Sequence, residues 1–143
     1  MINNRDVVRH CLAAFNLRDV DAARALVAED LVNHSARPEA QGRAGLFAVW
    51  KELWTAFPDL AWTCEDVVAE GDRVVCRTRM RGLNAGSLRF KLMPLPATGR
   101  AFDGESIHIF RVVDGQIAEL WAQRDEVGML RQLGHLTLAK ARS

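Results

Sequence analysis

The stretch FDGESIHIFRVVDGQIAELWAQR, residues 102–124, decides the fold class of this chain. Asp114-Gly115 is a strong signal for a tight hairpin turn. The residues on both sides of it are mostly β-branched, aromatic or alternately polar, as in strands. We therefore predict a long strand from Phe102 to Val113 that pairs with a strand from Gln116 to about Arg124.

The preceding residues predict more strands of the same sheet. Residues 61–70 are extended in character and end at the turn signal Gly71-Asp72, and residues 73–82 then alternate between apolar and polar side chains. Residues 85–100 contain Gly86, Pro94, Pro96 and Gly99, which favour an irregular strand with a long loop. The sequence predicts a meander of antiparallel strands.

The first part of the chain has helical periodicity instead. Apolar residues recur at three- and four-residue steps, and capping residues are available at Asn3 or Asn4 and at Asp19 or Asp21. A third helix is predicted from about Ala44 to Ala56, before Pro58. We expect an α+β fold: one domain, residues 1–143, with a curved antiparallel sheet packed on three N-terminal helices. A conical space between them would form a pocket.

Composition excludes several classes of protein. The chain has 143 residues, 49% hydrophobic and 26% charged, and a net charge of +1, which gives no global basic field for nucleic acid. No window is long and apolar enough to cross a membrane, and the N-terminus lacks the apolar core of a signal peptide. Cys11, Cys64 and Cys76 are widely spaced, so we expect three free thiols in a reducing cytoplasm.

The sequence lacks a phosphate-binding glycine loop, a GxSxG elbow and an HExxH motif. Its four histidines fall on separate predicted elements, so we expect no metal site and no cofactor. Acid/base chemistry in an apolar cavity, or binding alone, remains.

Two histidines and one aspartate are the candidate catalytic residues. His108 lies mid-strand on the same face as Ser106 and Phe110, and is either a hydrogen-bonded core residue or a proton-handling group. His34 ends a short extended segment and is either a surface residue or a second such group. Asp125 can cap the helix predicted at 127–133, line the pocket mouth, or do both. Arg124 beside it is a partner or a solvated charge.

Four tryptophans occur in a chain without tyrosine. Core packing is one interpretation of Trp50, Trp54 and Trp121, and the lining of a pocket for a flat hydrophobic ligand is the other. Arg77, Arg79 and Arg81 alternate along one strand, where acidic residues on neighbouring segments can pair with them. We therefore predict a solvated sheet face or a subunit contact there, and no nucleic-acid site.

Several segments together resemble the SnoaL-like polyketide cyclases of the nuclear transport factor 2-like superfamily. The resemblance runs from about Val7 to Gly134 and rests on Asn33-His34-Ser35, Ala56-Phe57-Pro58-Asp59-Leu60, 65–75, Thr98-Gly99-Arg100, Ile107-His108-Ile109-Phe110-Arg111, 114–119 and Arg131-Gln132-Leu133-Gly134. It implies a dimer with a deep pocket in which an intramolecular aldol condensation closes a ring without a metal or cofactor.

The resemblance also assigns roles to residues. It places a substrate-binding histidine at His108 and the family's acid/base aspartate at Ala122, which cannot move a proton. Trp121-Ala122-Gln123-Arg124-Asp125 is therefore a departure from the cyclase pattern, with the nearest carboxylate at Asp125.

We hypothesise a cofactor-independent cyclase-type enzyme acting on a hydrophobic carbonyl compound. In it His108 and His34 handle protons or anchor the substrate, Asp125 orients one of them or acts as the base, and the remaining candidates line the pocket: Trp50, Trp54, Trp121, Ser106, Phe110 and Arg124. The alternatives are a non-catalytic small-molecule binding module, motivated by Ala122, and another superfamily reaction such as isomerisation or epoxide hydrolysis.

Overall fold

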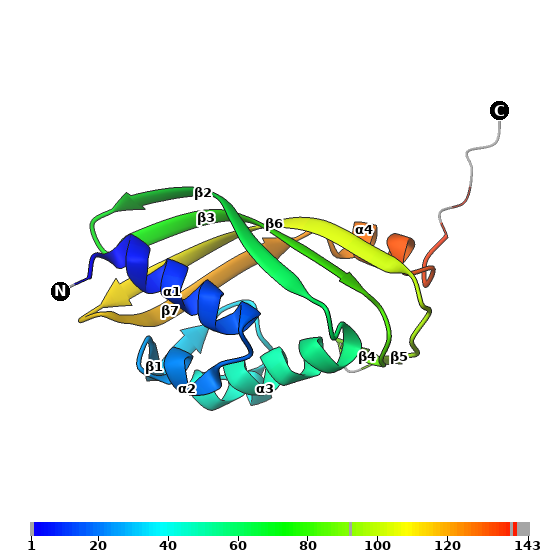
Figure 1. Ribbon diagram of the computed structural model, residues 1–143, viewed down its shortest axis with the longest axis horizontal. Helices are drawn as coiled ribbons and strands as arrows, with labels where there is room; N and C mark the ends of the chain where they lie inside the picture. Colours follow the sequence, from blue (N-terminus) through cyan, green and yellow to red (C-terminus); the bar gives the residue numbers. More distant parts are fainter. Residues whose placement is uncertain (1, 92, 138, 140–143) are drawn as a thin grey trace.

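A computed structural model describes residues 2–91, 93–137 and 139. Its elements in chain order are α1 (Asn4–Asn16), α2 (Val20–Arg24), β1 (Val27–Asn33), η1 (Pro38–Ala40), α3 (Gly42–Ala56), β2 (Ala61–Glu70), β3 (Arg73–Leu83), β4 (Leu88–Phe90), β5 (Met93–Leu95), β6 (Ala101–Val113), β7 (Gln116–Arg124) and α4 (Glu126–Gln132). Helices α1, α2 and α3 lie on one side of a bent sheet, and α4 lies near the other end of its strands (Figure 1).

The main sheet has the strand order β1-β7-β6-β3-β2. The pairs β2–β3, β3–β6 and β6–β7 are antiparallel, whereas β1 runs parallel to β7. The Asp114-Gly115 turn joins β6 to β7 with positive φ at both residues, 50° and 77°, as the tightest hairpin turns require. The predicted α+β fold and both predicted hairpins are confirmed.

Local capping fixes where the first helices begin. The Asn3 side chain accepts a hydrogen bond from the Asp6 amide, and the Asp19 side chain accepts one from the Ala22 amide, which satisfies donors that a helix N-terminus leaves free. At the other end of α1, the Asn16 amide side chain donates to the Trp62 carbonyl and accepts from the Trp62 amide, both at 2.8 Å. These bonds tie α1 to β2.

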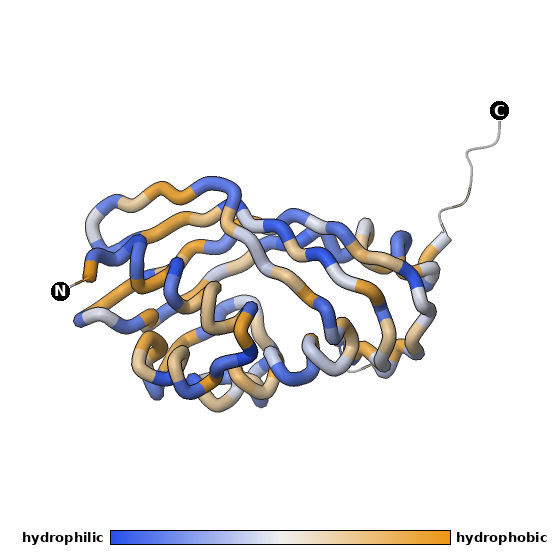
Figure 2. Tube along the Cα trace, viewed as in Figure 1, coloured by the Kyte–Doolittle hydropathy of each residue, from blue (hydrophilic) through white to orange (hydrophobic). Residues whose placement is uncertain are grey.

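Aromatic rings fill the space between the helices and one end of the sheet. The Phe15 ring from α1 lies 5.2 Å from the Trp50 ring, 5.4 Å from the Trp54 ring and 5.2 Å from the Trp62 ring, measured between centroids. Helices and strands both mix apolar and polar residues along their length (Figure 2), as elements with one buried face do. This end of the molecule is a packed core.

Two segments differ from the sequence-based expectation. The second helix was expected to bury Leu26 and Val27, but it ends at Arg24, and Val27 begins β1, which joins the main sheet. The irregular stretch 85–100 forms a separate two-stranded sheet, β4–β5. The first departure depends on a distant partner, since Val27 pairs with Ile117, which local periodicity does not report. The second is a short local hairpin in which Leu88 pairs with Leu95.

Candidate functional site

A cavity of about 260 Å³ lies between the end of the main sheet, α3, the β4–β5 hairpin and α4. Most of its wall is apolar, contributed by Ala36, Ala40, Val49, Leu53, Phe57, Leu60, Met80, Leu88, Phe90, Phe102 and Met129. An apolar wall with a few polar groups is typical of small-molecule sites. The cavity therefore offers room for a compact hydrophobic ligand.

Among the polar residues of the cavity wall, three that can donate hydrogen bonds lie on the neighbouring strands β1, β7 and β6: Asn33, Arg124 and Ser106. Ser106 on β6 pairs in register with Arg124 on β7, so both side chains share the concave face. Asn33 at the end of β1 is also buried on the cavity wall, and its Oδ1 accepts a hydrogen bond from the Ser35 amide at 3.0 Å. Among the described residues the Asn33 Nδ2 has no hydrogen-bond acceptor. The three side chains present mainly hydrogen-bond donors.

Ser106 connects the cavity to a buried histidine. The Ser106 hydroxyl lies 2.8 Å from the Thr78 hydroxyl, and both hydroxyls lie 3.5 Å from His108 Nδ1. His108 is 1% exposed. Burial lowers the pKa of the His108 imidazole from 6.5 to about 3, with a smaller contribution from the positive charge of Arg124. His108 is therefore neutral near pH 7. It is not among the residues that line the cavity, but it contacts Ser106, which is.

Arg124 is a cation without a partner carboxylate. No ion pair involves its guanidinium in residues 2–91, 93–137 and 139, whereas the other cavity cations Arg37, Arg89 and Lys91 are each paired with a glutamate. Arg124 is exposed to solvent at the edge of the cavity. The protein atoms around its guanidinium lower the pKa by desolvation, and the nearby Glu126 raises it. The side chain still carries its charge, because a guanidinium does not lose its proton in proteins.

Asp125 has both of the roles that the sequence left open. Its carboxylate accepts a hydrogen bond from the Gly128 amide at 2.8 Å and so caps α4. The same residue lines the cavity beside Arg124. A capping bond uses only part of the acceptor capacity of a carboxylate, so Asp125 can also accept a hydrogen bond from a bound molecule.

The structure places His34 outside the cavity wall. Side chains alternate along β1, and because Asn33 faces inward, His34 faces outward. Its ring stacks on the Trp121 ring at 4.6 Å, and its Nε2 donates to Glu119 at 2.8 Å. That bond, together with one from Arg111, lowers the pKa of the Glu119 carboxyl. His34 therefore does not converge with His108, and Trp121 also lies on the outer face.

The other predicted aromatic residues pack in the core. Trp50 and Phe110 are almost fully buried, and Trp54 is partly buried against Phe15. None of these three rings is among the cavity-lining residues. Of the residues predicted for the site, the structure brings Ser106, Arg124 and Asp125 to the cavity and sets His108 directly behind Ser106.

Sequence reasoning missed Asn33 as a site residue. The only signal for it was the alternation of Leu31 and Asn33 within the extended segment before the polar loop, which puts both side chains on the buried face. That signal depends on knowing that the segment is a strand, which the sequence showed only weakly.

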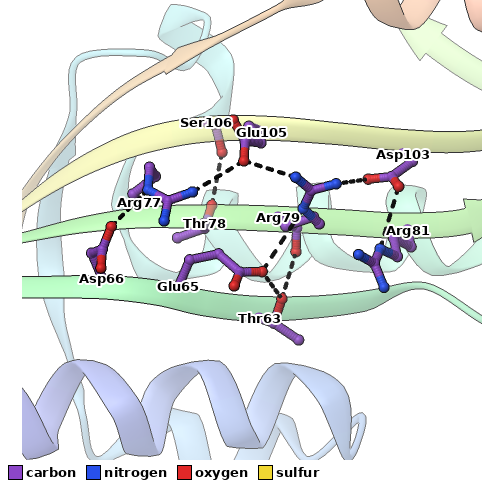
Figure 3. Close-up of polar contacts among 10 residues, drawn as sticks. All are labelled: Thr63, Glu65, Asp66, Arg77, Thr78, Arg79, Arg81, Asp103, Glu105 and Ser106. Atoms are coloured by element: carbon purple, nitrogen blue, oxygen red, sulfur yellow. Dashed lines mark hydrogen bonds and ion pairs between the residues drawn. The ribbon is translucent and has the colours of Figure 1, made fainter.

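The convex face of the sheet carries a ladder of ion pairs (Figure 3). Arg77 contacts Asp66 at 2.7 Å and Glu105 at 3.1 Å, while Arg79 contacts Glu105 at 2.8 Å and Asp103 at 2.9 Å. The predicted pairing of this arginine row with acidic neighbours is confirmed. Its positive charges are largely compensated within the chain, so the row is not a basic stripe.

In the described part of the chain, no three His, Cys, Asp or Glu side chains are grouped as a metal site would need. No described helix is long and apolar enough to span a membrane.

Comparison with known proteins identifies the family. The sequence profile of the SnoaL-like polyketide cyclases matches residues 5–133. The chain belongs to this family. The aklanonic acid methyl ester cyclase DauD of Streptomyces sp. (strain C5) is 33% identical over 133 residues, which are 90% of this chain and 80% of DauD. The nogalonic acid methyl ester cyclase of Streptomyces nogalater is 46% identical over 44 residues, 31% of this chain and 33% of that relative.

Solved structures of the SnoaL-like fold agree with this assignment. TsrD from Streptomyces laurentii superposes with a TM-score of 0.81 at 31% identity, covering 92% of this chain and 95% of TsrD. IdmH from Streptomyces antibioticus superposes with a TM-score of 0.78 at 34% identity, covering 93% of this chain and 99% of IdmH. This SnoaL-like chain therefore shares both sequence and fold with these relatives over most of its length.

Proposed function

We propose that this SnoaL-like chain is a cofactor-independent cyclase that closes a ring by acid/base chemistry on a hydrophobic carbonyl compound. The observation that carries the proposal is the single cavity that combines apolar walls, the donors Asn33, Ser106 and Arg124, and the carboxylate of Asp125. The names of its relatives support the same reaction class, since DauD is a cyclase of aklanonic acid methyl ester.

The Asp125 carboxylate would remove a proton from the carbon next to a carbonyl group of the substrate. Asn33 and Ser106 would donate hydrogen bonds to the oxygen of the resulting enolate, and the charge of Arg124 would lower its energy. The enolate carbon then forms a bond to a second carbonyl carbon of the same molecule, and the new alkoxide takes the proton back. The product is an isomer of the substrate.

His108 would act as a positioning residue in this scheme. An imidazole with a pKa near 3 is a weak base at pH 7. It can instead hold the Thr78 and Ser106 hydroxyls, which lie within 3.5 Å of its Nδ1. We assign no catalytic role to His34, because its ring lies on the opposite face of the sheet and is already paired with Glu119.

The test is conversion of aklanonic acid methyl ester by the purified chain, followed by chromatography and mass spectrometry for a ring-closed isomer. Asp125→Asn should lower turnover by about 10²–10⁴-fold, the usual contribution of one acid/base group. Asparagine is also a good helix cap, so α4 should remain folded. Asp103→Asn, on the convex face, is the matched control. An unchanged rate in Asp125→Asn would remove Asp125 from the mechanism.

A non-catalytic binding module is the second candidate, and one observation favours it. The residue paired with His108 across β6 and β7 is Ala122, which is nearly buried on the concave face. The resemblance to the cyclases placed the acid/base aspartate at this position, and alanine leaves His108 without a carboxylate there. Stable binding of the ester with no isomer formed would select this candidate over the enzyme.

We also propose that two copies associate through the convex face. Val68, Val75, Ile109 and Trp121 form one row across four strands of the sheet. Val68 is 63% exposed, and Ile107 next to this row is 52% exposed. The neighbouring ion-pair ladder carries both signs of charge and so can face a copy of itself.

Light scattering during size-exclusion chromatography tests the dimer. Ile107→Lys should shift the mass from dimer to monomer, because it buries a charge in the contact beside the apolar row. Val113→Lys, at the hairpin end of β6, should leave the dimer intact. A wild-type chain that is monomeric at high concentration would refute the proposal.

The cytoplasm is the proposed location. Cys11, Cys64 and Cys76 are all free thiols, which suits a reducing compartment.

A further inference from the structure

The cavity wall contains a glycine in the middle of a strand. Gly104 lies on β6 between Phe102 and Ser106, and residues two apart on a strand point their side chains to the same face. All three residues line the cavity, and so does Met80, the partner of Gly104 in register on β3. A glycine inside a strand often marks a place that another group approaches closely.

The ring of Phe102 occupies the space that a side chain at position 104 would need. A Cβ atom on Gly104 would lie 2.4 Å from Cζ and 2.7 Å from Cε2 of the Phe102 ring. Carbon atoms that are not bonded to one another lie about 3.5–4.0 Å apart at their best separation. The Phe102 ring therefore lies over the backbone of Gly104, and it can do so because glycine has no side chain.

The neighbours of Phe102 limit where its ring could move. The Phe57 ring, at the end of α3, lies 6.0 Å from it between centroids. Gly82 pairs with Phe102 across the sheet, and atoms of Phe57 and Leu60 lie 3.1 and 3.3 Å from the place of a Gly82 Cβ. Because the sheet and these side chains close two directions, a ring that is pushed off Gly104 moves into the cavity and narrows it.

We propose that Gly104 is a specificity-determining residue, which lets the Phe102 ring lie over β6 and so sets the size of the ring system that the cavity accepts. This inference rests on the proposed function, because it concerns the same cavity. It adds the size class of the substrate, a carbonyl compound with at least two fused rings. An apolar cavity of about 150 Å³ binds benzene, and this cavity of about 260 Å³ has room for a further ring.

Binding of methyl benzoate and methyl 2-naphthoate, followed by NMR titration of the full chain, tests this size selectivity. The two neutral esters differ by one fused ring. Gly104→Ala should bind methyl 2-naphthoate at least about 10-fold more weakly than the wild type does, and methyl benzoate within about threefold. Leucine lacks the ring atoms that overlap position 104, so the double variant Gly104→Ala/Phe102→Leu should regain methyl 2-naphthoate binding to within about threefold of the wild type.

Asp103→Asn is the matched control, because this neighbour of Gly104 pairs with Arg79 on the convex face. It should bind both esters as the wild type does. Phe102→Trp enlarges the same ring and leaves Gly104 unchanged, so it tests the proposal even where Gly104→Ala does not fold. It should weaken the binding of methyl 2-naphthoate more than that of methyl benzoate.

Three results would overturn the inference and leave the proposed cyclase function standing: equal effects of Gly104→Ala on the two esters, no recovery in the double variant, or equal effects of Phe102→Trp on the two esters. A wild-type chain that binds neither ester would overturn both proposals, because the cavity would then not be a site for hydrophobic carbonyl compounds.

Discussion

Replacing His108 by glutamine should make the folded chain less sensitive to acid. His108 is 1% exposed, and its surroundings lower the pKa of the imidazole from 6.5 to about 3. Glutamine does not titrate, yet it can still form hydrogen bonds with the Thr78 and Ser106 hydroxyls. The substitution therefore removes the titration of one buried group while keeping the polar cluster.

The sign and size of the effect follow from proton linkage. Between pH 6.5 and pH 3 the unfolded chain binds a proton at this imidazole and the folded chain does not, so the free energy of unfolding falls as the pH falls through this window. Each pH unit below 6.5 corresponds to about 1.4 kcal/mol. From about pH 7 to about pH 4.5, His108 should therefore cost the wild-type chain about 2–3 kcal/mol.

Urea unfolding at these two pH values, followed by tryptophan fluorescence, measures this difference. His108→Gln should lose about 2–3 kcal/mol less than the wild type between them. His10→Gln, which alters an exposed histidine of α1, should lose as much as the wild type. If the wild type and His108→Gln lost equal stability on acidification, the imidazole would not be held neutral by burial and the reasoning would be refuted.

Three further substitutions, at two positions, are tested by urea unfolding. Arg18→Ala should lower the free energy of unfolding by about 2 kcal/mol, because the guanidinium donates to the Leu60 and Pro58 carbonyls at 2.9 Å. Arg18→Gly should lose less, since φ at this residue is 60°, and equal losses would contradict that account. Gly45→Ala should destabilise α3 by about 1–3 kcal/mol although alanine favours helices, because its Cβ would overlap the Ala40 carbonyl. A stabilised variant would show that this contact relaxes freely.

Local patterns predicted the elements whose partners are close in the sequence. The β6–β7 hairpin follows from Asp114-Gly115, and alternation alone put Ser106, His108 and Phe110 on the concave face. The same alternation did not separate a cavity-lining side chain from a core one. Ser106 reaches the cavity, while Phe110 is packed in the core against the His108 ring, which in turn contacts Trp62.

The site residues that the sequence predicted wrongly depend on contacts between distant parts of the chain. His34 was a reasonable candidate until β1 paired with β7, since that pairing turns Asn33 inward and His34 outward. Trp50 and Trp54 were open to two interpretations for a different reason. A wide aromatic face on a helix can either line a cavity or pack in the core. Here Phe15 and Trp62 fill the space in front of this face, so its rings are core residues.

The parallel contact between β1 and β7 constrains how the chain acquires its structure. The Ser35 hydroxyl bonds to the backbone of Ala122, 87 residues further along the chain. During synthesis on the ribosome, β1 emerges long before its neighbour exists, and it must wait with unpaired backbone groups until β7 has followed. Contacts between such distant segments slow folding, so this early strand is the part of the nascent chain most exposed to mispairing with other chains.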